Sequence, residues 1–168
     1  TNPLKWQDLG IKAAPLIIIA VGLSICYRAN VWNIGAEGQY VAGAVGGTAV
    51  ALLTFGMEGP WILPAMILAG IAGGMLLAAI PAWFKTEFSV NEILTTLMLN
   101  YAIIQLLHFL LRTAWKDPMG FSFPKTKMFE ASQSLPYLWS GTIMHWGVPI
   151  AIVVALAAWF IMSRSLFG

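Results

Sequence analysis

The sequence predicts an all-α integral membrane protein with about five transmembrane helices. Of its 168 residues, 59% are hydrophobic and only 10% are charged, whereas a soluble domain carries about 25% charged residues. So few polar side chains could not cover this much apolar surface in water. Several apolar runs also approach the roughly 20 residues that cross the hydrocarbon core of a bilayer. The net charge of +2, without a basic patch interleaved with aromatic residues, gives no indication of nucleic-acid binding.

Five apolar runs are the candidate membrane helices. They cover about residues 13–27, 36–55, 61–84, 93–111 and 146–162. Pro15, Pro64 and Pro149 fall in the first turns of their runs, where the missing N–H of proline costs nothing. The stretch at about 112–145 is the long loop of the chain. Its mixture of charged and aromatic residues predicts a short interfacial helix or a docking surface.

The segment 33–39, with the sequence Asn-Ile-Gly-Ala-Glu-Gly-Gln, places polar side chains between two of these runs. A charge at bilayer depth costs a few kcal/mol or more, so Glu37 predicts a broken or re-entrant membrane helix. Two roles remain open for Glu37, namely bonding free backbone N–H groups at a helix start and lining a pathway. Asn33 and Gln39 are expected to share its hydrogen-bond network, because unpaired amides in lipid are costly.

Two glycine-containing motifs, 43–47 and 70–74, each place glycines four residues apart. In lipid, this spacing lets two helices approach closely. The motifs therefore predict ordinary packing within a helix bundle rather than a pore.

The fourth run carries two arcs of polar side chains. At 100° per residue, four of them fall within one narrow arc, namely Tyr101, Gln105, His108 and Arg112. Thr96 and Asn100 lie roughly opposite. This pattern predicts a helix between neighbours, with one arc facing a hydrated cavity. For His108 alone, snorkelling toward the interface or a bond to a neighbouring group is favoured over solute binding, because the residue lies near the helix end.

The tetrapeptide at 89–92 has the pattern of a helix start. Ser89 is followed three residues later by Glu92, directly before an apolar run, which predicts a capping box. A direct role of this turn, including Asn91, in contacting a partner protein is the alternative.

Catalytic chemistry finds little support in the sequence. The chain contains no G-x-S-x-G, H-E-x-x-H or Walker A motif. His108 and His145 are far apart in sequence and have no cysteine or carboxylate at metal-ligand spacing. We therefore expect no catalytic, cofactor-binding or metal-binding residues in this chain.

Two motifs in the same order resemble those of one bacterial permease family. The first covers residues 33–43, and the second covers 90–93 together with 96–101. Pro15, the run at 70–81, and Arg164 with Phe167 and Gly168 extend the resemblance over most of the chain. The family comprises the inner-membrane permease subunits of ABC importers for simple sugars and nucleosides. It is similar to the ribose and branched-chain amino acid permeases. The family chain is about twice as long, and Thr1 is not an initiator methionine, so we expect a fragment.

The resemblance implies a function and a set of partners. The chain would be a multi-pass protein of the bacterial inner membrane that forms, with a second permease subunit, one translocation path for a nucleoside or simple sugar. The second subunit would be an identical copy or a paralogue. A separate ATP-binding subunit would bind and hydrolyse ATP, and an extracytoplasmic solute-binding protein would deliver the solute. Alternating access would move the two permease halves around a central cavity.

Four residues are expected to line that cavity or form its gate, namely Asn33, Glu37, Gln39 and Asn100. Asn91 and Glu92 would begin the helix next to a cytoplasmic loop. A stand-alone transporter or channel driven by an ion gradient is the alternative function. A purely structural membrane subunit is a third alternative, for which an intramembrane Glu37 has no evident use.

The expected orientation conflicts with the positive-inside rule. A cytoplasmic C-terminal end with five crossings places Arg28, Lys85 and Arg164 inside the cell. The other six basic residues then lie outside, namely Lys5, Lys12, Arg112, Lys116, Lys125 and Lys127, whereas the rule favours cytoplasmic lysine and arginine. We follow the resemblance here, so the loop at 112–145 is expected to be extracytoplasmic.

Overall fold

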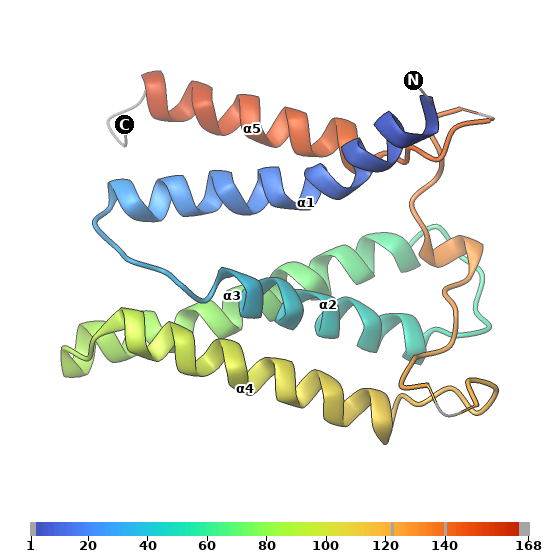
Figure 1. The fold of residues 1–168 in the computed structure, drawn as a ribbon, viewed down its shortest axis with the longest axis horizontal. Coiled ribbons are helices and arrows are strands. Elements are labelled where there is room, and N and C mark those ends of the chain that lie inside the picture. The colour runs from blue at the N-terminus through green and yellow to red at the C-terminus, as the bar shows by residue number, and fades with distance from the viewer. Residues whose placement is uncertain (1–2, 122, 140, 165–168) are drawn as a thin grey trace. The chain divides into compact units, whose positions relative to one another are not determined.

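The computed structural model describes residues 3–121, 123–139 and 141–164, and within them the fold is all-α (Figure 1). Its elements are α1 (Pro3–Arg28), α2 (Ala36–Leu53), α3 (Ile62–Phe88), α4 (Glu92–Arg112), the 3₁₀-helix η1 (Ala131–Gln133) and α5 (Gly147–Arg164). The predicted fold class is confirmed. Phe167 and Gly168, which carry part of the family resemblance, lie outside the described residues.

Four of the described helices are long and apolar enough to cross a membrane, namely α1 from Lys5 onward, α3, α4 and α5. The sequence led us to expect five, and α2 is the one that falls outside this set. Its 18 residues have a length of about 27 Å. Glu37, Gln39 and four glycines, however, lower its apolar character. Among the expected crossings, α2 is therefore the least suited to face lipid on all sides.

The start of α1 differs from the prediction. The helix begins at Pro3 rather than near residue 13, and Pro15 lies in its interior instead of in a first turn. Proline at the first helical position is favourable because it has no N–H to leave unpaired. Asp8 and Lys12 lie one turn apart, and their side chains form an ion pair of 2.8 Å on the exposed surface. The polar residues before the apolar run thus extend the helix instead of preceding it.

The helix break expected near residues 33–39 lies slightly earlier in the chain. α1 ends at Arg28, and residues 29–35 are not helical. Asn30 adopts a left-handed conformation with φ of 55°, which asparagine tolerates better than most residues. Glu37 and Gln39 belong to the first turn of α2 rather than to the break itself.

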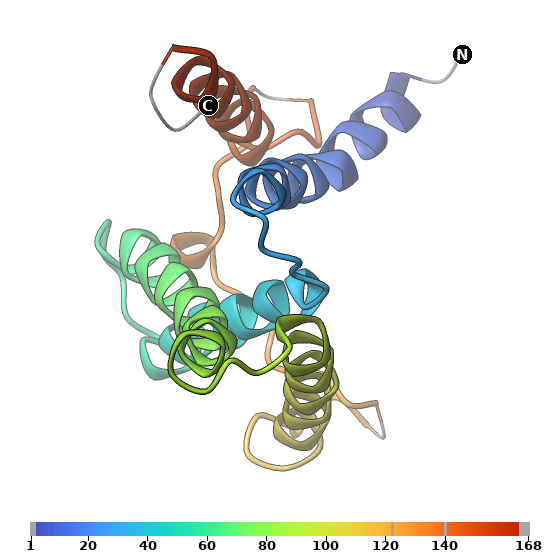
Figure 2. The same cartoon turned by 90° about the vertical axis from the view of Figure 1, so that its left-hand side faces the viewer.

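The chain divides into two compact units, each described here by itself. The first contains Thr1–Val31 and Leu135–Gly168. In it, α1 and α5 pack side by side and run in the same direction (Figure 2). Gln7 fastens the segment before α5 to α1, because its side-chain oxygen accepts hydrogen bonds from the Thr142 hydroxyl and the Ile143 backbone N–H, both 3.1 Å long.

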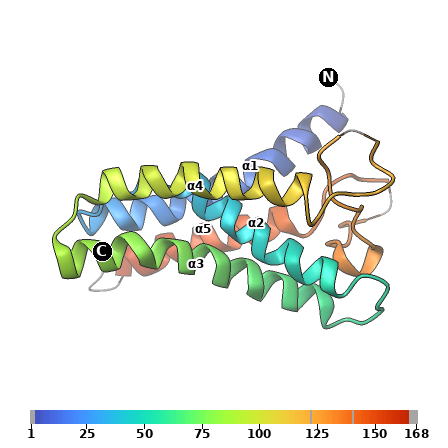
Figure 3. The ribbon, with the colours of Figure 1, turned by 90° about the horizontal axis from the view of Figure 1, so that it is seen from below.

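The second unit is Trp32–Ser134, in which α2 packs against both α3 and α4 (Figure 3). Glycines make the α2–α3 contact very close, as the glycine motifs predicted. A Cβ atom added to Gly46 would lie 2.5 Å from the carbonyl oxygen of Ala69, and one added to Gly73 would lie 2.6 Å from that of Ala42. Real Cβ atoms do not come this close to other atoms. The backbones of α2 and α3 can therefore be in contact at these positions only because glycine has no side chain.

In the described residues of the long loop, 112–121, 123–139 and 141–145, no α-helix forms beyond the end of α4, contrary to one of the two expectations for it. Its only helical element in the described residues is η1, with three residues. Gln133 of η1 is buried, and its side-chain amide donates a 2.8 Å hydrogen bond to the carbonyl of Ala51 near the end of α2. Lys127 lies 4.6 Å from the ring centre of Phe55. These contacts hold the loop against the C-terminal end of α2.

Candidate functional site

The turn before α2 is held by two side-chain hydrogen bonds. The Oδ1 atom of Asn33 accepts a 2.8 Å bond from the backbone N–H of Gly35, and its Nδ2 group donates a 3.0 Å bond to Oε1 of Gln39. Gly35 occupies the N-cap position and has no side chain to cap the helix. Asn33 therefore performs the local turn-forming role that asparagine side chains fulfil at such sites.

Glu37 does not join this network. Its side chain is exposed, and among the described residues it accepts no hydrogen bond and forms no ion pair. Asn33 and Gln39 bond to each other instead, so the expectation of a shared network with Glu37 is wrong. The structure likewise shows no capping bond from Glu37. Its position in the first turn of α2 is still electrostatically favourable, because the positive end of the helix dipole attracts a carboxylate.

Two glycines bring the start of α2 against α4. A Cβ atom on Gly35 would lie 2.8 Å from the carbonyl oxygen of Thr96, and one on Gly38 would lie 2.8 Å from both Cα and Oδ1 of Asn100. The backbone N–H of Ile34 donates a 3.3 Å bond to the Thr96 hydroxyl, and that hydroxyl donates a 2.7 Å bond to the carbonyl of Glu92. Thr96 and Asn100 thus form a packing seam with the turn at 33–39.

Asn100 lies inside this seam. The residue is 8% exposed, and its Oδ1 atom is buried without a hydrogen-bond partner among the described residues. A buried, unpaired acceptor costs about 1–3 kcal/mol. Of the four residues predicted to shape the cavity, the structure brings Asn33, Gln39 and Asn100 together around the start of α2. Glu37 is on the same turn, but its exposed side chain takes no part in these hydrogen bonds.

The turn between α3 and α4 corrects the predicted capping box. Ser89 ends α3 in a left-handed conformation with φ of 53°, so it does not cap α4. Asn91 is the N-cap, and its Oδ1 accepts a 2.9 Å bond from the backbone N–H of Ile93. Glu92 is the first residue of α4, too early to serve as the third residue of a capping box. The sequence pattern suggested the wrong cap because the same short turn ends α3, at Ser89, and begins α4, at Asn91.

Glu92 ties this turn to its surroundings instead. Its carboxylate accepts a 2.6 Å hydrogen bond from Nζ of Lys85 at the end of α3. A backbone hydrogen bond from Trp32 also reaches the carboxylate. Glu92 therefore connects the end of α3, the start of α4 and the segment that leads into the turn at 33–39.

The two polar arcs of α4 have different surroundings, as their separation predicted. Thr96 is 4% exposed and Asn100 is buried beside it, whereas Tyr101 on the other arc is 65% exposed. Gln105, His108 and Arg112 are exposed as well. The arc of Thr96 and Asn100 therefore packs within residues 32–134, whereas the arc that contains Tyr101 does not.

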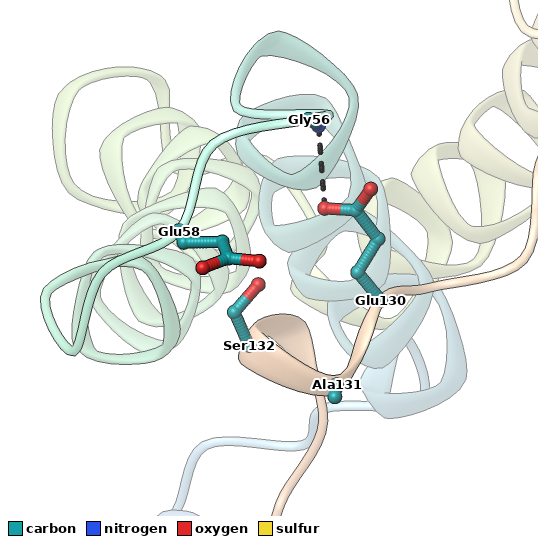
Figure 4. Close-up of a pocket in the computed structure, with 5 residues that line it drawn as sticks. All are labelled: Gly56, Glu58, Glu130, Ala131 and Ser132. Carbon is teal, nitrogen blue, oxygen red and sulfur yellow. Dashed lines mark hydrogen bonds between the residues drawn. The ribbon is translucent and has the colours of Figure 1, made fainter.

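A pocket that the sequence did not indicate lies at the opposite end of α2, where the loop meets it (Figure 4). Its volume is about 530 Å³, and its lining includes Glu58, Glu130 and Ser132. Glu130 already accepts a 3.2 Å bond from the backbone N–H of Gly56. No three His, Cys, Asp or Glu side chains gather at a metal-binding distance within the described parts of the chain. The pocket depends on residues more than 70 positions apart, which no local sequence pattern reveals.

Comparison with known proteins points to membrane transport. The sequence profile of a family described as "Branched-chain amino acid transport system / permease component" matches residues 8–168. The glucose ABC transporter permease protein TsgB13 of Haloferax volcanii is 32% identical, over 100% of this chain and 46% of the relative. The guanosine ABC transporter permease protein NupP of Bacillus subtilis is 30% identical, over 94% of this chain and 45% of the relative.

A third relative, the nucleoside ABC transporter permease protein NupB of Lactococcus lactis, is 24% identical over 99% of this chain and 52% of its own length. The chain thus spans about half the length of the curated relatives it matches. No solved structure matches it.

Proposed function

The chain belongs to the family of branched-chain amino acid transport system permease components, and from this membership we propose that it forms part of the translocation path of an ATP-binding-cassette importer. The family match over residues 8–168 carries the proposal. The chain is a multi-pass protein of the inner (cytoplasmic) membrane, with four helices of membrane-spanning length and composition. Permease components are not themselves enzymes, and the part of this chain would be to provide the passage.

The solute is a nucleoside or a simple sugar. Support comes from the relatives, whose names assign glucose, guanosine and nucleosides to them. These solutes are uncharged and rich in hydroxyl groups. A pathway for them needs hydrogen-bonding side chains, and most polar side chains of α4 are hydroxyl, amide or imidazole groups of that kind.

Three partners complete the system. A separate subunit binds and hydrolyses ATP, a second permease subunit (an identical copy or a paralogue) supplies the other side of the path, and an extracytoplasmic protein delivers the solute. ATP is the cofactor of the ATP-binding subunit, and this chain binds none. ATP-driven closure of the partner subunits moves the permease halves between outward-facing and inward-facing states.

The turn at 33–39 is the gate of this path. Its first part, residues 33–35, is not helical. The Asn33–Gln39 hydrogen bond holds this part to the first turn of α2, and Gly38 packs against Asn100. The turn presents one unpaired carboxylate, that of Glu37, next to membrane-spanning helices. Irregular backbone at membrane depth is tolerated where it is packed in protein or lines a water-filled cavity.

Purification of the tagged, full-length protein in mild detergent tests the function, with mass spectrometry of the proteins that stay bound. We expect a co-purifying subunit with Walker A and B motifs. Uptake of labelled guanosine and labelled glucose into vesicles should require ATP and persist when an ionophore collapses ion gradients. Uptake by a protein purified alone, abolished by the ionophore and indifferent to ATP, would assign the alternative function of a gradient-driven transporter.

A further inference from the structure

The hydrogen-bonding side chains of the membrane-spanning helices are concentrated on α4. Over residues 13–23 of α1, 62–84 of α3 and 147–162 of α5, the only side chains able to hydrogen-bond are tryptophan indoles. Between residues 95 and 108, α4 carries six such groups, namely Thr95, Thr96, Asn100, Tyr101, Gln105 and His108. This unequal distribution needs an explanation, because polar side chains in membrane-spanning helices are costly.

Packing within the unit accounts for only half of these six groups. The hydroxyl of Thr95 donates to the carbonyl of Asn91 one turn earlier, and that of Thr96 donates to the carbonyl of Glu92, so both threonines are satisfied on their own helix. Asn100 is buried against Gly38. Tyr101, Gln105 and His108 remain, exposed and without a hydrogen bond among the described residues.

These three residues form one strip along α4. Successive residues turn by about 100°, so their directions fall within an arc of about 60°, and the strip is about 10 Å long. Nothing in residues 32–134 covers it. Lipid is an unfavourable neighbour, since polar residues in membrane helices face the protein interior or a water-filled cavity. The apolar spans of α1, α3 and α5 could not satisfy it either, as their sequences offer almost no partner groups.

The composition of the strip favours a water-filled path over contact with a second copy of the chain. Membrane helices that pack closely use small residues, as α2 and α3 do at Gly46 and Gly73. The exposed strip and its continuation toward the helix start contain only larger side chains, with Leu94 and Met98 before Tyr101. It also combines a phenol, a carboxamide and an imidazole, which together offer hydrogen-bond donors and acceptors.

We propose that Tyr101, Gln105 and His108 of α4 form the solute-facing surface of the translocation path, where they hydrogen-bond the hydroxyl groups of a neutral solute. This assignment rests on the proposed function. It separates the residues of α4 that contact the solute from Thr96 and Asn100, which position the turn at 33–39. It also gives His108 a role in solute contact, whereas the sequence alone favoured snorkelling or a bond to a neighbouring group.

Cysteine accessibility in the full-length protein tests the proposal. In a Cys26→Ser background, single cysteines replace Tyr101, Gln105 or His108, and membrane vesicles are treated with a membrane-impermeant methanethiosulfonate. The matched control is Leu106→Cys, because Leu106 is also exposed but points about 100° away from Gln105. We expect the three strip positions to react at least about tenfold faster than the control, since thiolates form in water and not in lipid. Transported glucose or guanosine should slow the reaction at the strip.

A second measurement keeps the outcome independent of folding. Gln105→Leu should lower the initial uptake rate by about tenfold or more at an unchanged membrane level, whereas Leu106→Ala should leave uptake unchanged. Equal reactivity at positions 105 and 106, or a spontaneous cross-link between two copies at position 105, would overturn the assignment. If the Cys26→Ser protein shows ATP-dependent uptake while the strip is unreactive, only this inference fails. If ATP-dependent uptake is missing in the unmodified protein, the proposed function fails first.

Discussion

Glu37 differs from its neighbours in the turn at 33–39 because it has no partner among the described residues. Its exposed carboxylate therefore contributes little to the packing of the second unit, while Asn33 and Gln39 hold the turn. An unpaired carboxylate that is retained next to membrane-spanning helices indicates a use outside folding. For Glu37, stability and function should consequently be separable by substitution.

Glu37→Gln removes the charge and keeps the shape, so we expect the full-length protein to accumulate at its usual level. Its initial rate of solute uptake should fall by about tenfold or more, because charge-assisted hydrogen bonds are roughly twice as strong as neutral ones. Uptake of labelled guanosine and glucose, normalised to the amount of protein in the membrane, measures the effect. Glu87→Gln is the control, since Glu87 is also exposed but lies at the C-terminal end of α3. Equal uptake by both variants would remove Glu37 from the gate.

Asn100 poses the opposite case, because its Oδ1 atom is buried and unpaired. Asn100→Leu replaces the amide with an apolar group of similar size and should raise the free energy of unfolding by about 1 kcal/mol. Uptake should nevertheless decline, because the amide no longer supports the gate, and gains in stability are often accompanied by a loss of activity. The melting temperature in detergent measures the first effect. Asn100→Ala, which leaves a cavity, should lower the melting temperature. A lowered melting temperature for Asn100→Leu would mean that Oδ1 has a partner in the folded protein.

At the scale of the helices, the α2–α3 seam depends on backbone contact at glycines. Gly46→Ala would place a Cβ atom 2.5 Å from the carbonyl oxygen of Ala69, so the helices must separate. We expect a loss of about 1–3 kcal/mol, the usual cost of overpacking. Gly22→Ala in α1 is the control, since nothing lies within 4 Å of its added Cβ and alanine favours a helix by about 1 kcal/mol. Melting temperatures of the two variants should therefore move in opposite directions, and a shared direction would contradict close packing at Gly46.

Sequence patterns located the helices well where apolar periodicity and flanking polar residues agreed. The predicted spans at 61–84 and 93–111 begin within one residue of α3 and α4. The two predicted glycine motifs pack against each other. The start of α1 differs from the prediction because polar residues before the apolar run continue the helix, so that Pro3 and not Pro15 lies in its first turn. α2 is not among the helices of membrane-spanning length and composition, because polar residues shorten the apolar part of the predicted crossing.

The candidate site was predictable as a set of residues but not as a set of contacts. Asn33, Gln39 and Asn100 were selected because amides are rare in apolar runs, and all three lie around the start of α2. Their partners depend on distances that the sequence does not contain, since Gly38 meets a residue 62 positions away. The same reasoning explains the capping box, because both Ser89 and Asn91 are acceptable caps and only the observed end of α3 distinguishes them.

At the scale of the whole molecule, the described chain provides one side of a path. The polar strip of α4 and the turn at 33–39 both belong to Trp32–Ser134, and about half the length of the relatives lies outside this sequence. A single polar helix cannot enclose an aqueous passage. The remaining length and the second permease subunit would have to supply the other walls, so transport should require the full-length protein.

The orientation of the protein gives the last prediction, because the count of basic residues and the family resemblance disagree about it. The 21 residues of α4 extend for about 32 Å, enough to cross the hydrocarbon core. The α3–α4 turn and the loop after α4 must then lie on opposite sides of the membrane. In a Cys26→Ser background, we expect a cysteine at Met128, which is 86% exposed, to react in intact cells with an impermeant maleimide. A cysteine at Glu87 should react only after the cells are opened.

The reverse pattern would show that the four basic residues at the end of α4 and in the loop after it are cytoplasmic, as the positive-inside rule favours, namely Arg112, Lys116, Lys125 and Lys127. It would also place the turn that contains Asn91 and Glu92 outside the cell, beyond the reach of an ATP-binding subunit. Labelling of both positions in intact cells would mean that α4 does not cross the membrane. In that case the strip of Tyr101, Gln105 and His108 could not face a transmembrane path.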